Sequence, residues 1–378
     1  MTKSSYILLL FALPLVHPQG NNLTICNTET IATKTVFEFW HQATDDCELD
    51  TSNLFEMRQK LLENHNNDQI NELLSNHVSS SLMGVLFNQI MATISTKSSI
   101  RSKPDFQKII NTLYAEDKTF IMKIWQQALT ESILFMDIQN IIQHILLIEE
   151  NNELKLDLFD YLLNKYKGQH TNDQRLMPLL VYGITSMEKE IAFEDNTKNT
   201  KFNNNLLKIL QKLPEPLLVL YQHWAHNITL LNKQYNDYIY AERNIGPADN
   251  KRYIFTFMPN QNKYKSKGYF KVQLNAKGML AIGAYYGPSY KYIAAEDHSA
   301  FMCLDSPSEG SQWWQVLWPL GNDEELVAFQ NTATEELLCA TGQYNEKLIL
   351  ISMLATDKHR NNPACQWKVF KRIKNHSI

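Results

Sequence analysis

The sequence predicts a chain of the α + β class, in which a helical N-terminal domain is followed by a β-trefoil domain. Two observations support this division. Only three glycines lie between Asn21 and Arg243, whereas eight of the twelve lie from Gly246 onward. Across the same boundary the spacing of apolar residues changes from the period of a helix to the period of two that is typical of strands. We therefore expect a signal peptide over 1–20, a helical domain over 21–243, a linker over 244–250 and the trefoil over 251–378.

The trefoil is expected from a unit of four short strands near the end of the chain. These strands are 326–329, 337–340, 347–353 and 367–370, and the last one begins with Trp367. An earlier stretch repeats the pattern over 291–297, 301–305 and 311–318, where Trp314 lies in the closing strand. Three further runs between 253 and 284 bring the count to ten of the twelve strands of a trefoil. Because the closing Trp fills the barrel, we expect Trp314 and Trp367 to be buried in equivalent places.

The N-terminal part has the apolar periodicity of a nearly all-helical domain. We expect helices over 33–43, 53–63, 68–94, 104–114, 118–148 with a break near Asp137, 154–165, 176–190, 202–213 and 216–242. The last one has the clearest pattern, because Leu217, Trp224, Leu231 and Tyr238 recur every seven residues. Pro216 lies at its start, where the first turn of a helix tolerates a proline. We interpret this segment as an internal packing helix in preference to a dimeric coiled coil.

The first twenty residues have the pattern of a secretory signal peptide. Lys3 provides a positive charge, residues 6–16 form an apolar run, and cleavage is expected near Gly20. The run is too short to cross a bilayer, and no later stretch reaches the roughly 18 apolar residues of a membrane-spanning helix. We therefore expect a secreted protein without a membrane span. Secretion makes three N-x-Ser/Thr sequons candidate glycosylation sites: Asn22, Asn227 and Asn375.

The chain contains five cysteines, Cys26, Cys47, Cys303, Cys339 and Cys365. In an oxidising compartment they should pair, and the odd count leaves one over. Cys26 and Cys47 lie close together and far from the others, so we expect them to close an N-terminal loop. None of the spacings matches a zinc site.

The trefoil contains a candidate sugar site. Gln312-Trp313-Trp314 fits the Gln-x-Trp signature of ricin-type lectin trefoils, and the Cys-Leu-Asp sequence at 303–305 fits the motif that precedes it in such units. Lectins of this kind bind sugar with an acid and an exposed aromatic ring. Asp305, together with Tyr285 or Tyr286, is therefore a possible glycan-binding group. The Trp itself has a structural role in the barrel, and the fold alone does not establish lectin activity.

A second candidate binding site is a lysine-rich stretch in which Lys263, Lys265, Lys267 and Lys271 are interleaved with aromatic residues. From Lys251 onward the chain has 15 Lys and Arg against 11 Asp and Glu, whereas the whole chain has a net charge of −4. A basic face on an otherwise acidic secreted protein would attract sulphated glycans or anionic protein surfaces, with a strong dependence on salt. The alternative is an ordinary solvated hairpin.

No catalytic or cofactor motif is evident. The sequence contains no nucleophile elbow, no His-Glu-x-x-His, no phosphate loop and no dinucleotide fingerprint. His223 and His226 lie three residues apart, but no third ligand lies nearby, so we interpret them as helix surface. We predict that the protein is not an enzyme and has no cofactor or metal. Nucleic acid is not expected as a partner of a secreted chain.

The signal peptide, the long helical region that begins with Cys26 and Cys47, and the Trp-rich C-terminal part resemble the mosquito salivary gland protein 1 family of saglin-like proteins. The resemblance is one of size, architecture and composition over the whole chain. It implies a secreted salivary protein that enters a host during blood feeding, with no catalytic residues. Its partners would be host haemostatic or immune proteins, or surfaces inside the gland. The expected function is a non-enzymatic binding protein that acts through protein–protein contacts, and the alternative is carbohydrate binding by the trefoil.

The similarity to ricin-type units also implies one disulfide. In such units a disulfide commonly joins the second strand to the stretch before the closing Trp, and Cys339 and Cys365 hold these positions. The equivalent partner of Cys303 would fall near Gly310 or Ser311, where there is no cysteine. The resemblance therefore implies that Cys303 is the odd thiol. A buried thiol is the commoner state, because free Cys behaves as a small hydrophobic residue.

Overall fold

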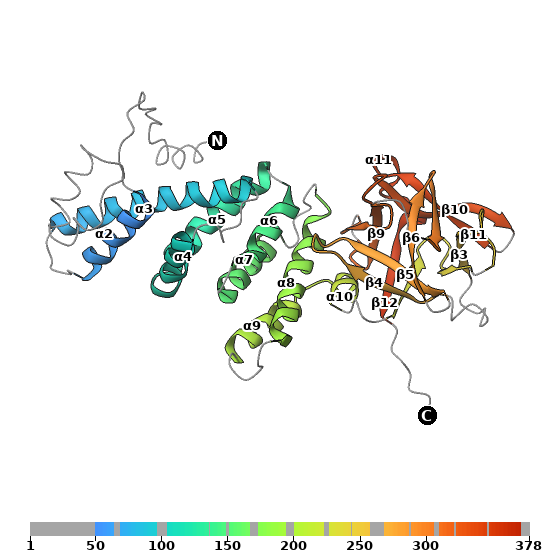
Figure 1. Ribbon diagram of the computed structural model, residues 1–378, viewed down its shortest axis with the longest axis horizontal. Helices are drawn as coiled ribbons and strands as arrows, with labels where there is room; N and C mark the ends of the chain where they lie inside the picture. The colour runs from blue at the N-terminus through green and yellow to red at the C-terminus, as the bar shows by residue number, and fades with distance from the viewer. Residues whose placement is uncertain are drawn as a thin grey trace, which may run out of the picture. The chain divides into compact units, whose positions relative to one another are not determined.

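The structure is a computed structural model of the chain, and the chain forms two compact units, Met1–Leu158 and Phe159–Ile378. Figure 1 follows their elements along the sequence. The predictions for the signal peptide, for the helix over 33–43 and for the pair Cys26 and Cys47 lie outside the described residues. The structure describes residues 50–63, 69–96, 104–135, 137–148, 151–166, 173–193, 200–222, 227–242, 244–257, 268–286, 289–305, 310–320, 323–345 and 348–371.

The first unit is helical in its described part. Its elements are α2 (Thr51–Glu63), α3 (Gln69–Thr96), α4 (Pro104–Glu116), α5 (Lys118–Phe135), α6 (Ile138–Leu146) and the beginning of α7 (Asn152–Tyr166). Asp and Asn side chains begin several helices, because their oxygen atoms accept hydrogen bonds from the first free amide groups. Asp50 and Asn53 bond to each other's amide groups at the start of α2, and Asn151 accepts a bond from Leu154 N in α7. These bounds confirm the predicted helices within a few residues.

The predicted helix over 118–148 is interrupted at Asp137, as expected. Asp137 has an extended ψ angle of 123°, and its carboxylate accepts a hydrogen bond from Gln139 N at 3.0 Å. This side chain therefore caps α6 and separates it from α5. The core of the unit includes one row of buried residues on α3, which packs against α2 and α5. The row recurs every fourth residue: Val78, Leu82, Leu86, Ile90 and Ile94.

Helix α3 also contains the one stretch in the described part of the chain, Ser75–Ser95, that has the length and apolar composition of a membrane span. A third of its apolar window (33%) is buried inside the structure. The core helix of a globular unit gives the same signal, so the described residues show no clear transmembrane span. Ser79, Ser80, Ser81 and Asn88 interrupt the apolar run of this stretch, so its sequence did not predict a span.

The second unit begins with helices and continues into a sheet. After the end of α7 come α8 (Leu176–Phe193), α9 (Thr200–Leu210) and α10 (Glu215–Tyr221). Pro216 lies in the first turn of α10, as expected, but the predicted continuation of this helix to 242 is wrong. Residues 227–232 and 238–241 form two strands instead. The sheet therefore starts at Asn227 and not at Lys251, and the predicted linker over 244–250 lies between two of its strands.

The heptad pattern of this segment misled the prediction, because several of its residues also fit a period of two. Along the strand Asn227–Asn232, buried Ile228, Leu230 and Asn232 alternate with less buried residues. The polar stretch that follows forms a turn in which Asn236 has a φ of 53°. Asn adopts this left-handed conformation more readily than most other residues. The Asn-rich turn was therefore the sequence signal that argued against a helix.

The strands form three consecutive units of four. The first has β1 (Asn227–Asn232), β2 (Tyr238–Ala241), β3 (Lys251–Phe257) and β4 (Phe270–Leu274). The second has β5 (Leu280–Tyr286), β6 (Ser289–Glu296), β7 (Ser299–Cys303) and β8 (Trp314–Leu317). The third has β9 (Leu326–Asn331), β10 (Glu336–Asn345), β11 (Leu348–Ala355) and β12 (Trp367–Lys371), with the short helix α11 (Thr356–His359) and a 3₁₀ turn (Pro363–Cys365) before its last strand.

The strand pairing is that of a β-trefoil. Six strands close a ring in the order β1, β12, β9, β8, β5, β4, with β4 paired back to β1. The remaining strands form the hairpins β2–β3, β6–β7 and β10–β11, and β3, β7 and β11 pair with one another. The trefoil prediction for the C-terminal part is thus confirmed by the topology, with β1 and β2 as the two strands that the sequence analysis missed.

The units share one arrangement around the closing strand. Trp314 opens β8 and Trp367 opens β12, and both are fully buried. Trp314 Nε1 donates to Ile293 O at 3.1 Å, and Trp367 Nε1 donates to Leu338 O at 2.9 Å. Phe270 has the same place at the start of β4 and is also fully buried. The prediction of two buried, equivalent Trp residues is confirmed.

A buried asparagine at the end of the first strand repeats in the first and third units. Asn232 Nδ2 donates to Ala364 O at 2.8 Å, and Asn331 Nδ2 donates to Ser311 O at 2.7 Å. Each Oδ1 accepts hydrogen bonds from two amide groups of the turn that follows. Each asparagine therefore joins its own turn to the bend before the closing Trp of a neighbouring unit.

Cys339 and Cys365 form the predicted disulfide, with their Cα atoms 4.1 Å apart. Cys303 is buried and is a free thiol, as the ricin-type similarity implied. Its place in the unit is different from the expected one, since Cys303 lies in the third strand, β7, and Cys339 in the second strand, β10. By the Trp hydrogen bonds described above, the residue equivalent to Cys339 is Ala294 in β6. The Cys-Leu-Asp sequence at 303–305 therefore does not occupy the motif position that the sequence analysis gave it.

Candidate functional site

A group of tyrosines lies on the outer surface of two neighbouring strands, β5 and β6, which Figure 1 shows beside β4. Tyr285 pairs with Tyr290, and their ring centroids are 5.2 Å apart. The rings of Tyr290 and Tyr292 are 5.1 Å apart. Both contacts are edge-to-face, which is a favoured geometry for aromatic pairs. Tyr285 is the most open of the three, with 55% of its surface exposed. We call Tyr285, Tyr290 and Tyr292 the tyrosine face.

Tyr290 is fixed by the backbone of the two adjacent strands. Its hydroxyl donates to Lys271 O at 2.6 Å and also lies 2.9 Å from Gly283 O. A Cβ atom at position 283 would come within 2.7 Å of the Tyr290 ring, so a glycine is needed where the ring crosses β5. Burial, and then the neighbouring Tyr292, raise the pKa of Tyr290. The hydroxyl therefore stays protonated, and the ring forms a fixed support for Tyr285.

Lys271 adds a positive charge at the edge of the tyrosine face. Its Nζ atom lies 5.1 Å from the centre of the Tyr285 ring and 3.5 Å from the Tyr285 hydroxyl. A cation over an aromatic ring at an exposed site contributes roughly 0.5–1 kcal/mol. The other candidate lysines, Lys263, Lys265 and Lys267, lie outside the described residues. The structure thus joins Lys271 to Tyr285 through a direct contact.

The other residues of the predicted glycan site have different surroundings. The hydroxyl of Tyr286 donates to Glu242 O, which fixes it to the segment after β2. Asp305 is exposed just beyond the end of β7, and in the described part of the chain no hydrogen bond joins it to Tyr285. Leu304 O accepts a bond from Lys291 Nζ, which holds the chain before Asp305 against β6. A sugar site that combines Asp305 with Tyr285 therefore stays a prediction.

One of the three candidate sequons lies in the described part of the chain. Asn227 opens β1 opposite Lys271 of β4, and it is partly exposed. Residues directly opposite each other in antiparallel strands have neighbouring side chains on the same side of a sheet. A glycan on Asn227 would therefore border the tyrosine face. Asn22 and Asn375 lie outside the described residues, and the occupancy of each sequon stays a prediction.

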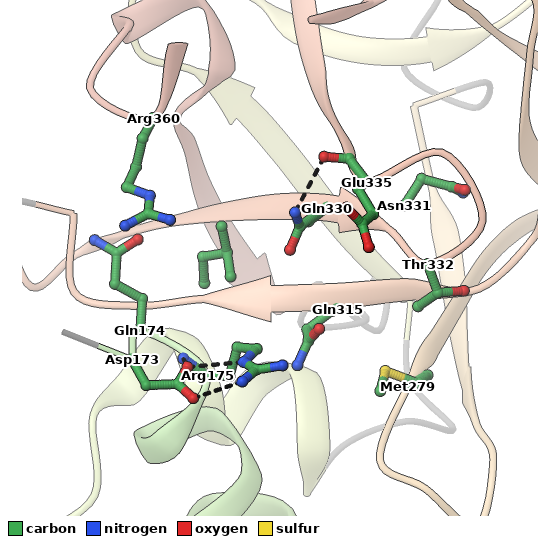
Figure 2. A pocket seen from close by; sticks show the side chains of 11 residues that line it. Asp173, Gln174, Arg175, Met279, Gln315, Gln330, Asn331, Thr332, Glu335 and Arg360 are labelled. Carbon is green, nitrogen blue, oxygen red and sulfur yellow. Dashed lines mark hydrogen bonds and ion pairs between the residues drawn. The ribbon is translucent and has the colours of Figure 1, made fainter. Parts of the chain in front are cut away.

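A second candidate site is a cavity of about 580 Å³ lined by residues at the start of α8 and on β8, β9 and the segments next to them. Figure 2 shows its side chains from close by. We call it the polar cavity, because most of its lining groups are amides or charges. Its volume is within the range of small-molecule pockets in proteins. Its polar lining includes Gln174, Arg175, Gln315, Gln330, Glu335 and Arg360.

An ion pair at the edge of the polar cavity orders one of its two arginines. Arg175 Nε lies 2.8 Å from Asp173 Oδ1, and Arg175 Nη2 lies 2.7 Å from Asp173 Oδ2. Burial would raise the pKa of Asp173, but the hydrogen bonds from Arg175 and the charges of Arg175 and Arg360 hold this pKa below its usual value. The carboxylate is therefore ionised at neutral pH. The Asp173 carboxylate forms a bidentate pair with Arg175. Arg360 is therefore the arginine with fewer contacts in the cavity.

Metal binding finds no support in the described residues, where no group of three His, Cys, Asp or Glu side chains is placed to hold an ion. His223 and His226 lie outside this part of the chain.

No known protein family and no curated protein matches the sequence. Several solved structures resemble its C-terminal part. The designed threefold-symmetric protein ThreeFoil shares 11% identity over 38% of this chain and 96% of its own, with a TM-score of 0.30. A salivary protein of Culex quiquefasciatus from the cysteine and tryptophan-rich family has 9% sequence identity over 39% of this chain and 94% of its own, with a TM-score of 0.30. SeviL bound to an asialo-GM1 saccharide has 14% sequence identity over 39% of this chain and 98% of its own, with a TM-score of 0.28. Similarities this low do not define the function, and the trefoil assignment rests on the strand pairing.

Tyr285 and Tyr286 were predicted from the sequence, whereas two members of the tyrosine face and the whole polar cavity were not. Tyr290 and Tyr292 are two residues apart in a strand, a spacing that places them on one side of the sheet. That signal was available in the sequence. The polar cavity gave no such signal, because it combines Gln174 with Gln315 from a distant part of the chain.

Proposed function

We propose that this chain is a non-enzymatic binding protein that acts outside the cell and contacts a partner protein through the tyrosine face. The observation that carries the proposal is Tyr285, an exposed ring that rests on the fixed ring of Tyr290. Tyr is enriched among the residues that dominate binding energy at protein interfaces. A tyrosine that is largely exposed and also held in place is therefore suited to contact a partner.

The order within the tyrosine face supports this function. The Tyr290 hydroxyl is held by Lys271 O, and the Tyr292 hydroxyl donates to Gln273 Oε1 at 2.5 Å. Side chains that are already ordered lose less conformational entropy on binding than mobile ones. Lys271 places a positive charge beside Tyr285, so a partner surface with acidic side chains fits best.

The extracellular setting is supported by the disulfide between Cys339 and Cys365, since structural disulfides persist mainly in oxidising compartments. Secretion into saliva, and host haemostatic or immune proteins or gland surfaces as the partners, belong to the proposal. They derive from the resemblance to the mosquito salivary gland protein 1 family.

A second candidate function is carbohydrate binding by the trefoil. The contact between Lys271 and Tyr285 is the observation that favours it. An exposed ring can stack against the apolar side of a sugar, and the ammonium group can bind a sulphate or carboxylate on the same glycan. This function would use the same surface as the protein partner, so one set of variants tests both.

The test replaces Tyr285 in the full chain with a photo-crosslinking phenylalanine analogue and exposes the protein to host plasma or gland extract. Tyr344 is the matched control, because it is 44% exposed and lies in the same trefoil outside the tyrosine face. We expect a discrete crosslinked protein from position 285 and not from position 344. The same pattern from both positions, or no crosslink at all, would contradict the proposed protein contact.

A glycan array with the full chain, read at low and at physiological salt, tests the second function. Binding that weakens with salt and is lost in Lys271→Gln would favour an anionic glycan at this surface. Salt-resistant binding to a neutral sugar, lost in Tyr285→Ala, would favour a lectin. Signals that neither variant changes would exclude the tyrosine face as a glycan site.

A further inference from the structure

The polar cavity contains hydrogen-bonding groups that the chain itself does not satisfy. Gln174 is held firmly, since its side-chain Nε2 donates to Pro319 O at 2.8 Å and its backbone carbonyl accepts a bond from Trp318 N at 2.9 Å. The other end of its amide group, Oε1, is buried and has no partner among the described residues. A buried acceptor without a partner costs free energy, roughly 1–3 kcal/mol. A bound ligand that donates a hydrogen bond would remove this cost.

Further acceptors lie on the opposite side of the polar cavity. Gln330 uses its Nε2 to bond Glu335 O and Thr356 Oγ1, both at 3.0 Å, which leaves its Oε1 without a partner in the described part of the chain. The Glu335 carboxylate likewise has no ion pair or hydrogen bond there. Figure 2 shows Gln330 and Glu335 together, across the hollow from Gln174 and Arg360. The cavity therefore presents acceptors from two sides.

The available cation of the polar cavity is Arg360. Arg175 forms the bidentate pair with Asp173, whereas the guanidinium of Arg360 makes no hydrogen bond or ion pair with the described residues. A guanidinium binds a carboxylate through two parallel hydrogen bonds. A ligand that fits all these groups has one anionic group for Arg360 and several hydrogen-bond donors spread around it.

We propose that the polar cavity binds a sugar residue that carries a carboxylate, of the uronic acid type. The carboxylate would pair with Arg360, and the ring hydroxyls would donate to Gln174 Oε1, Gln330 Oε1 and the Glu335 carboxylate. The amide of Gln315, which can donate and accept, would serve a hydroxyl that does both. The ammonium of an amino acid directs its donors from one nitrogen, so it fits acceptors on two sides less well. This site is separate from the tyrosine face, so either proposal can fail without the other.

The test is calorimetric titration of the full chain with methyl glucuronide and with methyl glucoside, which differ in the carboxylate. We expect saturable binding of the glucuronide and binding of the glucoside that is roughly tenfold weaker. Arg360→Gln should remove this difference and leave the glucoside affinity unchanged. Lys358→Gln is the matched control, because it removes one positive charge from the exposed helix α11, which ends just before Arg360, without touching the cavity. It should bind both sugars like the unchanged protein.

Glu335→Gln separates the sugar from an ammonium ligand. Its amide oxygen can still accept from a hydroxyl but carries no charge for an ammonium group, so the variant should weaken glycine binding much more than glucuronide binding. Glycine titrated into the same variants serves as the ammonium probe. Stronger binding of glycine than of the glucuronide, equal affinity for glucuronide and glucoside, or the same loss in Lys358→Gln as in Arg360→Gln would each overturn the proposal. The thermal midpoint of each variant, compared with the unchanged chain, shows that a lost signal is not lost folding.

Discussion

The third and first units of the trefoil have the same strand arrangement but different contacts that hold it. In the third unit Trp367 fills the barrel and bonds Leu338 O, and a disulfide joins Cys339 to Cys365. In the first unit Phe270 takes the place of the Trp and has no polar atom to donate, and there is no cysteine. The buried asparagine before the first turn is present in both units. The turn is therefore repeated more faithfully between the units than the contacts that close the barrel.

We expect the largest effect from Trp367→Ala. The replacement leaves a cavity in the barrel and an unpaired Leu338 O, so the free energy of unfolding should fall by roughly 3–5 kcal/mol. Trp367→Phe copies the first unit and should cost less, about 2 kcal/mol. Urea unfolding measures both, and Phe270→Ala is the matched change in the first unit. A loss in Trp367→Phe as large as that in Trp367→Ala would show that the two units are not equivalent.

Removal of the disulfide should have the next largest effect. The double variant Cys339→Ala, Cys365→Ala opens a loop with a sequence separation of 26 residues, for which the chain-entropy estimate is a loss of roughly 3 kcal/mol. The change should bring the third unit closer to the first, which has no such bond. Thermal and urea unfolding measure the effect, with Cys303→Ala as a control that removes a thiol and no crosslink. Unchanged stability of the double variant would mean that the bond does not support this unit.

The asparagines should give equal, smaller effects. Asn232→Ala removes one hydrogen bond to a carbonyl and two acceptor contacts to a turn, and Asn331→Ala removes the same set and a longer bond to Trp313 O at 3.4 Å. Each should cost about 2 kcal/mol. Equal losses in urea unfolding would confirm that this contact is the shared feature of the units. A neutral result at one site and a large one at the other would refute that view.

The smallest effect on stability should come from ionisation of the Cys303 thiol. Burial, and then the charge of Glu296, raise the pKa of this thiol to about 11. Little thiolate is then present at pH 8, and the thiolate is the reactive form. We expect slow alkylation of the native protein at pH 8 and fast alkylation after unfolding, measured by mass spectrometry. Because the folded pKa lies above that of the unfolded chain, the stability that this thiol contributes is lost as the pH rises from about 9 to about 11. Rapid native labelling at pH 8 would contradict its burial.

The difference between the units also explains how much the sequence could predict. The strands of the third unit could be predicted from the sequence, because Trp367, Cys339 and Cys365 mark them. The first unit lacks these markers, and the apolar residues of β1 fit a heptad as well as a strand. Only the turn at Asn236 could have indicated that the predicted helix ends before this strand. Local spacing predicted the helices well because each depends on its own periodicity.

The candidate sites were less predictable than the fold. Tyr285 and Lys271 were named separately, but their contact depends on the register between β4 and β5, which spacing does not reveal. The polar cavity depends on Gln174 packing against Pro319, and the two lie 145 residues apart. Contacts of this kind follow from the completed fold, whereas a single sequence shows only local patterns.

The pairing of β1 with β12 determines when the barrel can be finished during synthesis. Ile228 lies opposite Lys371, so the first strand waits for the last strand of the chain. At the usual rate of translation the interval is on the order of ten seconds. During that time one edge of β1 has unpaired amide and carbonyl groups, which can pair with other chains. A chain that ends before Trp367 would keep this edge open permanently, so the last strand decides whether the released chain closes the barrel or remains an open sheet that can pair with other chains.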